Sequence, residues 1–308
     1  PYIYSFQGPF FFLNYSLDTL HAYDPYAFNI MQNEIGTMVY DQYDMLLHNL
    51  VWKNFQFTRF DVAMAGKYSF IGKSNVVYTG NPKMDAFYQK EKCQENIWDN
   101  VLKKSGNPNA KKIIYAPCHE LDKSQPSAFS TFADNYLTML ELAETYSDET
   151  VWVIRPHPYL KYMSIKVGLF KNKEEYEEYM NRWRGLKNAD VMEGGDYTDL
   201  FLYSDGMILD SISFLAGYLY VHKPLLFLKG GKQFFNEFGQ ELMKVHYTTD
   251  GASEKGISDF LEQIVIEGND KNKELREQFF KEYMDYRSEL GRSASENIFH
   301  EIVNGLWG

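Results

Sequence analysis

Four short runs of apolar residues, each followed by polar residues, mark the chain after residue 110. The runs are Ile113–Tyr115, Val151–Ile154, Met207–Leu209 and Leu225–Leu228. An unbroken apolar run of this length that ends in turn residues is typical of a strand buried on both faces, as in a parallel sheet. Between the runs, apolar residues at three-to-four spacing predict helices over 129–143 (after Ser127 as a cap), 174–184, 196–203 and 214–220. The alternation predicts a doubly wound α/β domain from about residue 110 to 265.

The first 90 residues differ from the rest of the chain in composition and in the pattern of their apolar residues. It is rich in Tyr, Phe, Asn and Gln, with a strand and turn predicted over 1–13, a helical pattern over 29–52 and a short strand over 76–78. We therefore divide the chain into a partial domain over 1–90 and a second domain over 91–308 that includes terminal helices. Since the first residue is proline, we expect the chain to be a piece of a longer protein.

Polar residues of the kinds that do chemistry follow each predicted strand. Because ligands bind beyond the carboxyl ends of parallel strands, these side chains are expected to meet at one crevice. Arg155 suits a phosphate because its guanidinium is planar and charged, and Pro158 holds His157 extended. The alternative is that His157 forms a rigid corner with a local role. The candidates are His119, Arg155, His157, Asp210, Ser211, Ser213 and Lys229.

The stretch 210–213 stands where a strand is predicted to become a helix. A helix N-terminus offers free N–H groups and a positive dipole end, and Ser211 and Ser213 add hydroxyl donors. This combination favours a phosphate site, although ordinary N-capping explains the same residues. Lys229 can contact phosphate or belong to a solvated turn.

Composition excludes several other functions. The formal net charge of −11 argues against a nucleic-acid partner, which requires a basic face. Cys93 and Cys118 form no disulfide framework, which fits a reducing cytoplasm. No His, Asp or Glu set has metal-ligand spacing, and no apolar stretch reaches the roughly 18 residues that a membrane span needs.

Five motifs in order resemble those of the CDP-glycerol glycerophosphotransferase family, the teichoic-acid primases and polymerases. They are Gly80–Asp85, Tyr115–Pro117, Arg155–Pro158, Tyr203–Ser213 and Lys223–Phe227, and the resemblance covers about residues 75–265. It implies a GT-B fold, with 1–90 as a partial Rossmann-like acceptor-side domain and 91–308 as the domain that binds the donor nucleotide. It also implies a transferase that moves a polyol-phosphate unit from a CDP-linked donor to a cell-surface polymer of teichoic-acid or capsule type.

The resemblance further assigns roles to the candidates. It implies that His157 and Arg155, our catalytic candidates, lie beside the donor pyrophosphate, and that Ser211 and Ser213 hold its phosphates. From their positions after the predicted strands we also expect His119, Asp210 and Lys229 to bind the donor. No cofactor or metal is expected beyond the CDP-linked donor itself. The expected acceptor is a polymer or a lipid-linked chain, reached in the cytoplasm or by peripheral contact with the inner face of the plasma membrane.

Two positions depart from the family pattern. Ile212 stands where the first serine of the family's pair is expected, and Gln7 aligns with a histidine that is thought to act as base. Either His21 or His48 replaces that histidine, or this chain works differently. Two alternatives therefore stay open: a GT-B nucleotide-sugar glycosyltransferase or epimerase, and a degenerate transferase module without catalysis.

Overall fold

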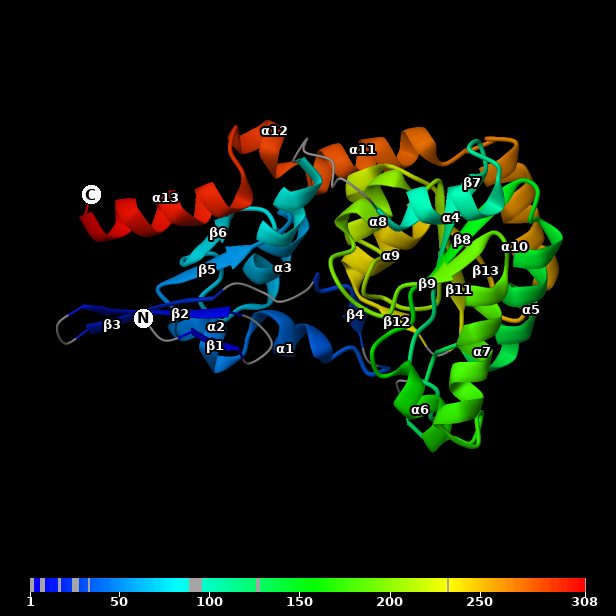
Figure 1. The fold of residues 1–308 in the computed structure, drawn as a ribbon. Helices are drawn as coiled ribbons and strands as arrows, with labels where there is room; N and C mark the ends of the chain where they lie inside the picture. The colour runs from blue at the N-terminus through cyan, green and yellow to red at the C-terminus, as the bar shows by residue number, and fades with distance from the viewer. Residues whose placement is uncertain are drawn as a thin grey trace. The chain divides into compact units, whose positions relative to one another are not determined.

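The computed structural model describes residues 3–5, 9–15, 18–23, 28–32, 34–88, 96–125, 128–231 and 233–307 (Figure 1). The chain forms two compact units: unit 1 consists of residues 1–89, 234–242 and 277–308, and unit 2 of residues 90–233 and 243–276. The sequence interpretation attached the terminal helices to the later domain, whereas residues 277–308 group with unit 1. The Asp85 carboxylate explains this grouping, because it accepts hydrogen bonds from the Tyr286 hydroxyl and the Ala294 amide.

Unit 2 is built on a six-stranded parallel sheet. Its strands lie in the order β13-β11-β10-β7-β8-β9. They are β7 (Lys111–Ala116), β8 (Thr150–Ile154), β9 (Ala189–Val191), β10 (Gly206–Leu209), β11 (Leu225–Lys229) and β13 (Tyr247–Asp250). All four predicted strands lie in this sheet, which confirms the predicted architecture. The strand order reverses between β7 and β10, and ligands of doubly wound sheets bind at such a switch point.

Helices cover both faces of this sheet, which explains why the apolar runs are unbroken. Successive side chains of a strand point to opposite faces. Ile113 and Tyr115 belong to a core that they share with Phe132 of the helix following β7, while Ile114 between them is equally buried. Burial of each such side chain stabilises the fold by about 1.5–3 kcal/mol.

The helices of unit 2 divide between the two faces. Figure 1 shows α5, α7 and α10 on one side of the sheet and α4 and α8 on the other. The helical segments are α4 (Ile97–Ser105), α5 (Phe132–Thr145), α6 (Leu160–Lys166), α7 (Lys173–Gly185), α8 (Thr198–Tyr203), the 3-10 helix η2 (Gly217–Val221), α10 (Glu254–Asp259) and the π-helical η3 (Phe260–Ile266).

Unit 1 contains a mixed sheet in the order β1-β2-β3-β5-β6. The pairs β1–β2 and β2–β3 are antiparallel, and the pairs β3–β5 and β5–β6 are parallel. Its strands are β1 (Ile3–Ser5), β2 (Pro9–Tyr15), β3 (Asp18–Tyr23), β5 (Lys53–Gln56) and β6 (Val76–Tyr78), and β4 (Met31–Gln32) pairs with β12 (Phe234–Phe235). Since α3 connects β5 to the parallel strand β6, these three elements form one βαβ unit.

The remaining helices begin and end as follows. Those within unit 1 are α1 (Met38–Tyr43), α2 (Leu46–Leu50), α3 (Arg59–Tyr68), the 3-10 helix η1 (Pro82–Tyr88), α12 (Tyr286–Leu290) and α13 (Ala294–Trp307), and α9 (Glu237–Val245) and α11 (Lys273–Tyr283) have residues in both units. A capping box precedes α13: the Ser293 amide donates to Glu296, and the Glu296 amide donates to the Ser293 hydroxyl.

The predicted helix over 214–220 is wrong. Residues 213–216 form a turn and only Gly217–Val221 form a 3-10 helix. The connection 210–224 is only slightly longer than the dozen or so residues that a crossover between parallel strands needs, and its first residues are used in the 211–213 turn. The stretch 29–52 also differs, because it contains β4 and two short helices. The predicted cap Ser127 lies outside the described residues, and α5 has Thr131 at its N-cap.

Candidate functional site

A small pocket lies at the carboxyl ends of β7, β8 and β10, at the point where the strand order reverses. Its volume is about 80 Å³. A cavity needs about 10–15 Å³ to hold one water, so this pocket accommodates a group of the size of a phosphate. We call it the switch-point pocket; it is lined by Ala116, Pro117, Arg155, Pro156, His157, Pro158, Glu193, Gly194, Ser211, Ser213 and Phe214. Four of the predicted site residues thus meet in one place.

The alternation of proline in the stretch 155–158 positions two of these side chains. The Arg155 amide donates to the Tyr115 carbonyl at 2.8 Å, and the His157 amide donates to the Pro117 carbonyl at 3.2 Å. These bonds continue the pairing of β7 with β8 beyond Ile154, the last residue of β8. In extended backbone the intervening amides would point away from β7, and proline has no such N–H to satisfy. Arg155 and His157 share a face because side chains two residues apart do so.

His157 has a defined tautomer and a neutral ring. Its Nδ1 atom accepts a hydrogen bond from the Tyr159 amide at 3.1 Å. Because a backbone N–H can only donate, Nδ1 carries no proton and the ring hydrogen is on Nε2. Burial, and secondly the electrostatic influence of His119, lower the pKa of His157 from 6.5 to about 4. At neutral pH the ring therefore offers one N–H donor and no charge.

His119 lies beside the pocket rather than in its lining. Its ring stacks on that of His157, with 3.8 Å between the centroids and 16° between the planes. The Nε2 atom of His119 is 3.2 Å from a carboxylate oxygen of Glu120. His119 thus contacts the ring of His157, and this contact fixes the plane of that ring.

Arg155 anchors a neighbouring loop in addition to lining the pocket. Its two terminal nitrogens donate to the carbonyls of Gly194 at 2.9 Å and Gly195 at 2.8 Å. The guanidinium carbon lies 5.8 Å from the ring centroid of Tyr197, and burial lowers the pKa of the group. The guanidinium has five N–H donors, so others stay available for a ligand.

The loop that Arg155 holds was missed from the sequence. It follows β9, a short strand for which the sequence analysis made no prediction. The signal was present: Ala189 and Val191 flank Asp190, and the glycine pair Gly194–Gly195 follows within a few residues. A three-residue run is too short to identify as a strand by its pattern alone.

Ser211 and Ser213 form a local turn that directs one hydroxyl hydrogen toward a ligand. The Ser211 hydroxyl accepts from the Ser213 amide at 3.2 Å and donates to the Ser213 hydroxyl at 3.1 Å. This leaves the hydroxyl hydrogen of Ser213 available to an acceptor in the pocket. The turn replaces the expected helix N-terminus, so the serine hydroxyls and not a helix dipole supply the polar groups here.

Asp210 is a positioning residue in the structure and does not line the pocket. It is 1% exposed. Its carboxylate accepts from the amides of Cys118 at 2.6 Å and Thr131 at 2.7 Å, and from the Ser130 hydroxyl at 2.9 Å. Burial raises the pKa of Asp210, and these bonds oppose that shift. The Asp210 carboxylate thus joins the ends of β7 and β10 to the start of α5. The sequence predicts that Asp210 binds the donor, whereas in the structure its buried carboxylate holds these elements together.

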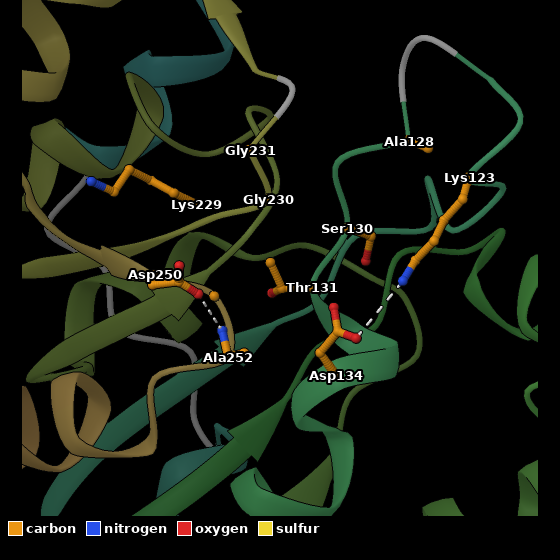
Figure 2. A pocket seen from close by; sticks show the side chains of 11 residues that line it. Lys123, Ala128, Ser130, Thr131, Asp134, Lys229, Gly230, Gly231, Asp250 and Ala252 are labelled. Carbon is orange, nitrogen blue, oxygen red and sulfur yellow. Dashed lines mark hydrogen bonds and ion pairs between the residues drawn. The ribbon is translucent and has the colours of Figure 1, made fainter.

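Lys229 belongs to a second pocket, of about 370 Å³, at the carboxyl ends of β11 and β13. We call it the polar pocket; it is lined by Lys123, Ala128, Ser130, Thr131, Asp134, Lys229, Gly230, Gly231, Asp250, Gly251 and Ala252. Figure 2 shows the side chain of Lys229 directed away from Ser130 and Thr131. Lys229 therefore contributes backbone to this pocket, and it does not join Arg155 and His157.

The candidate replacements for the missing base lie in unit 1. His48 is 1% exposed in α2, and burial lowers its pKa to about 4. His21 is part of β3, and Gln7 lies outside the described residues. Among the residues that the structure describes, no group of three or more His, Cys, Asp or Glu could hold a metal ion. Within the same ranges no helix combines the length and apolar character needed to span a membrane.

Comparison with solved structures identifies the fold. The wall teichoic acid polymerase TagF matches with a TM-score of 0.59 and 13% identity over 96% of this chain and 71% of that one. A UDP-N-acetylglucosamine 2-epimerase from Listeria monocytogenes matches with a TM-score of 0.55 and 15% identity over 83% and 60%. The corresponding epimerase from Neisseria meningitidis, bound to UDP-GlcNAc, matches with a TM-score of 0.50 and 18% identity over 74% and 56%. These relatives confirm the GT-B architecture.

The chain spans only about half the length of other matching structures, 52–55% of each. No curated protein sequence matches it. A family profile does: the profile described as CDP-Glycerol:Poly(glycerophosphate) glycerophosphotransferase covers residues 41–304. This range contains all seven predicted site residues and most of both units, and it confirms the resemblance seen in the sequence motifs. The chain belongs to the CDP-glycerol:poly(glycerophosphate) glycerophosphotransferase family.

Proposed function

We propose that this chain transfers a glycerophosphate-type unit from a CDP-linked donor to the end of a growing polymer of the teichoic-acid type. The observation that carries the proposal is the meeting of Arg155, His157 and Ser213 in a pocket of phosphate size within a member of this family. The acceptor would be a polymer or a lipid-linked chain reached from the cytoplasmic side of the membrane, with capsule polymer as a further target.

In the proposed reaction a hydroxyl of the acceptor attacks the β-phosphorus of the donor. The bond between this phosphorus and the bridging oxygen breaks, CMP leaves with the bonding electrons, and the acceptor hydroxyl loses its proton. Negative charge develops on the phosphate oxygens, and donors already in place stabilise it at no cost of reorganisation. The unused N–H groups of Arg155, the Ser213 hydroxyl and the Nε2–H of His157 are the donors of this pocket.

The geometry favours hydrogen-bond donation by His157 over proton transfer. A general acid works best when its pKa is near the working pH, and the pKa of His157 is lowered to about 4. Its Nε2–H is fixed by the Tyr159 amide on the opposite nitrogen. We therefore assign His157 to stabilisation of the leaving phosphate, with protonation of that phosphate as the alternative.

An epimerase or a nucleotide-sugar glycosyltransferase is the second candidate. The Listeria monocytogenes epimerase shares the fold over 83% of this chain, and a pyrophosphate site would serve either chemistry. A module without catalysis is the third, motivated by Gln7. A preference for cytidine or uridine nucleotides distinguishes the glycerophosphotransferase from the epimerase or glycosyltransferase. Catalytic turnover with an acceptor distinguishes an enzyme from the module without catalysis.

Calorimetric titration of the 308-residue chain tests the proposal. CDP-glycerol, CDP, UDP and UDP-N-acetylglucosamine are titrated in turn, and the same series is repeated with Ser213→Ala. We expect CDP-glycerol and CDP to bind more tightly than the uridine ligands, and Ser213→Ala to weaken CDP-glycerol by about 0.5–1.5 kcal/mol. Equal affinity for cytidine and uridine ligands would contradict the proposal, and a preference for UDP-N-acetylglucosamine would favour the epimerase.

A further inference from the structure

The polar pocket is lined by charged side chains of both signs. Figure 2 shows Lys123 and Asp134 on one side, Asp250 and Ala252 on the other, and Ser130 and Thr131 between them. The ammonium of Lys123 lies 3.9 Å from the Asp134 carboxylate, with side chains 81% and 48% exposed. One oxygen of Asp250 accepts from the Ala252 amide at 3.1 Å, which leaves the other oxygen for a ligand.

The lining of this pocket differs in kind from that of the switch-point pocket. Its volume of about 370 Å³ lies within the range of about 300–1,000 Å³ typical of ligand sites. No aromatic side chain lines it, so it has no surface on which a nucleobase could stack. Phe214 and the His157 ring line the switch-point pocket instead. A nucleobase therefore has rings to pack against beside the switch-point pocket, whose own volume suits a phosphate, and it has none in the polar pocket.

The polar groups match a small molecule that carries both hydroxyls and a phosphate. Carboxylates are acceptors only, so Asp134 and Asp250 suit hydroxyl donors and repel phosphate. The Lys123 ammonium, which is a donor only, suits a phosphate oxygen. Two glycines let the backbones around the pocket pack closely: a Cβ at Gly230 would lie 1.9 Å from the Phe129 carbonyl oxygen, and one at Gly251 would lie 2.0 Å from Thr131 Cγ2.

The two pockets are connected through the buried carboxylate of Asp210. Its neighbour Ser211 lines the switch-point pocket, and its hydrogen-bond partners Ser130 and Thr131 line the polar pocket. Both pockets also lie at the carboxyl edge of the same parallel sheet. This arrangement suits two substrates of one reaction.

We propose that the polar pocket binds the polyol-phosphate end of the acceptor, with Lys123 on its phosphate and Asp134 and Asp250 on its hydroxyls. This places that end of the acceptor in unit 2, whereas the resemblance of the sequence implies an acceptor side within residues 1–90. The inference rests on the proposed transferase function, since only a transferase of this kind needs a second polyol-phosphate site. The glycerol end of the donor has the same chemistry as the acceptor. The experiment therefore includes an arm that separates the two sources.

The probes are glycerol 3-phosphate and inorganic phosphate, added to the isotope-labelled 308-residue chain. Binding is followed by the amide NMR signals of Gly231 and Ala252, with and without saturating CDP-glycerol. We expect Lys123→Ala to weaken both probes roughly five- to tenfold. Asp134→Asn should weaken glycerol 3-phosphate roughly two- to threefold without weakening inorganic phosphate. Ala252→Phe should abolish binding by obstruction, and Lys187→Ala, at an exposed lysine 2.9 Å from Asp148, is the matched control.

The kinetic arm measures transfer from CDP-glycerol to a synthetic glycerol-phosphate acceptor. We expect Lys123→Ala to raise the KM for the acceptor and to leave the KM for the donor unchanged. Glycerol 3-phosphate binding that persists in Lys123→Ala and Ala252→Phe overturns the inference. Competition by CDP-glycerol overturns the assignment to the acceptor, because the donor would then occupy the pocket. If the chain binds glycerol 3-phosphate at this pocket but prefers no cytidine ligand, the ligand class stands and the proposed function fails.

Discussion

The rings of His119 and His157 stack face to face, 3.8 Å apart between centroids and inclined by 16°. The two histidines come from loops after different strands, β7 and β8, that pair in the sheet. Burial, and secondly the neighbouring imidazole of His119, disfavour a proton on His157 and lower its pKa to about 4. The pair therefore keeps His157 a neutral N–H donor over the physiological pH range.

The stacking predicts how the titration of His157 responds to substitution. In His119→Ala water reaches the ring of His157 and the neighbouring imidazole is removed, so the pKa of His157 should rise from about 4 toward its ordinary 6.5. In His119→Phe the stacking and most of the burial are kept, so the rise should be smaller. The measurement is an NMR pH titration of the imidazole of His157. An unchanged pKa in both variants would show that burial alone sets it.

His157→Ala should lower the rate of the chemical step more than it weakens donor binding. If His157 stabilises the leaving phosphate by a hydrogen bond, its contribution appears in the transition state, and the single-turnover rate should fall roughly 10²–10³-fold; a general acid would give a loss of roughly 10²–10⁴-fold. The dissociation constant for CDP-glycerol should change little. His157→Gln is the informative comparison, since an amide can donate one hydrogen bond without titrating. A rate that survives in His157→Ala would mean that the histidine is a structural corner between two prolines.

Arg155→Ala should weaken donor binding by about 1.5–3 kcal/mol, the contribution of a charge-assisted contact. It should also release the carbonyls of Gly194 and Gly195 from their hydrogen bonds. Arg155→Lys keeps the charge but lacks the planar guanidinium that places two separate nitrogens on the two carbonyls. Calorimetry with CDP-glycerol, together with amide hydrogen exchange over 193–197, checks both effects. If Arg155→Lys binds CDP-glycerol as tightly as the unmodified chain, and the amides over 193–197 exchange no faster, the hydrogen bonds from Arg155 to Gly194 and Gly195 have no role in donor binding.

Asp210→Ala should destabilise unit 2 without a direct loss of a ligand contact. The buried amides of Cys118 and Thr131 would lose their acceptor, and each unsatisfied donor costs about 1–3 kcal/mol. We expect the free energy of unfolding in denaturant to fall by about 3 kcal/mol. Asp148→Ala at an exposed aspartate is the control and should have little effect. Unchanged stability in Asp210→Ala would contradict the positioning role.

Stability should fall at mildly acid pH because of His246. The ring is 4% exposed, and burial lowers its pKa to about 3, whereas the unfolded chain protonates histidine near 6.5. The unfolded state therefore binds more protons between these values, and stability decreases as pH falls through this window. From pH 7.5 to 5.5 the expected loss from this group is about 1.4 kcal/mol.

Denaturant unfolding of His246→Gln at both pH values tests this sign. Glutamine can still donate to the Leu215 carbonyl, which lies 3.0 Å from the His246 Nε2 atom, but it does not titrate. The pH dependence of stability should shrink by the amount that His246 contributed. His300→Gln in α13 is the exposed control. An equal pH dependence in His246→Gln and the unmodified chain would show that other groups set it.

The sequence alone was sufficient for the strands of unit 2 and for four residues of the switch-point pocket. A strand buried on both faces requires an unbroken apolar run, which is a local property. The residues that follow such a run must emerge at the carboxyl edge of a parallel sheet. For Arg155 and His157 the flanking prolines also act locally, because they fix which amides can pair. The positions of Ser211 and Ser213 followed in the same way.

What the sequence left open depends on neighbours far along the chain. The reversal of strand order between β7 and β10 is decided by which apolar faces pack together. The burial of Asp210 follows from partners at 118, 130 and 131, and no local pattern distinguishes it from the exposed Ser213. The polar pocket draws Lys123 from the loop after β7, Asp134 from α5 and Asp250 from the end of β13. Such groups become neighbours only when the strands and helices that carry them pack into one sheet, and this packing is decided by the whole core.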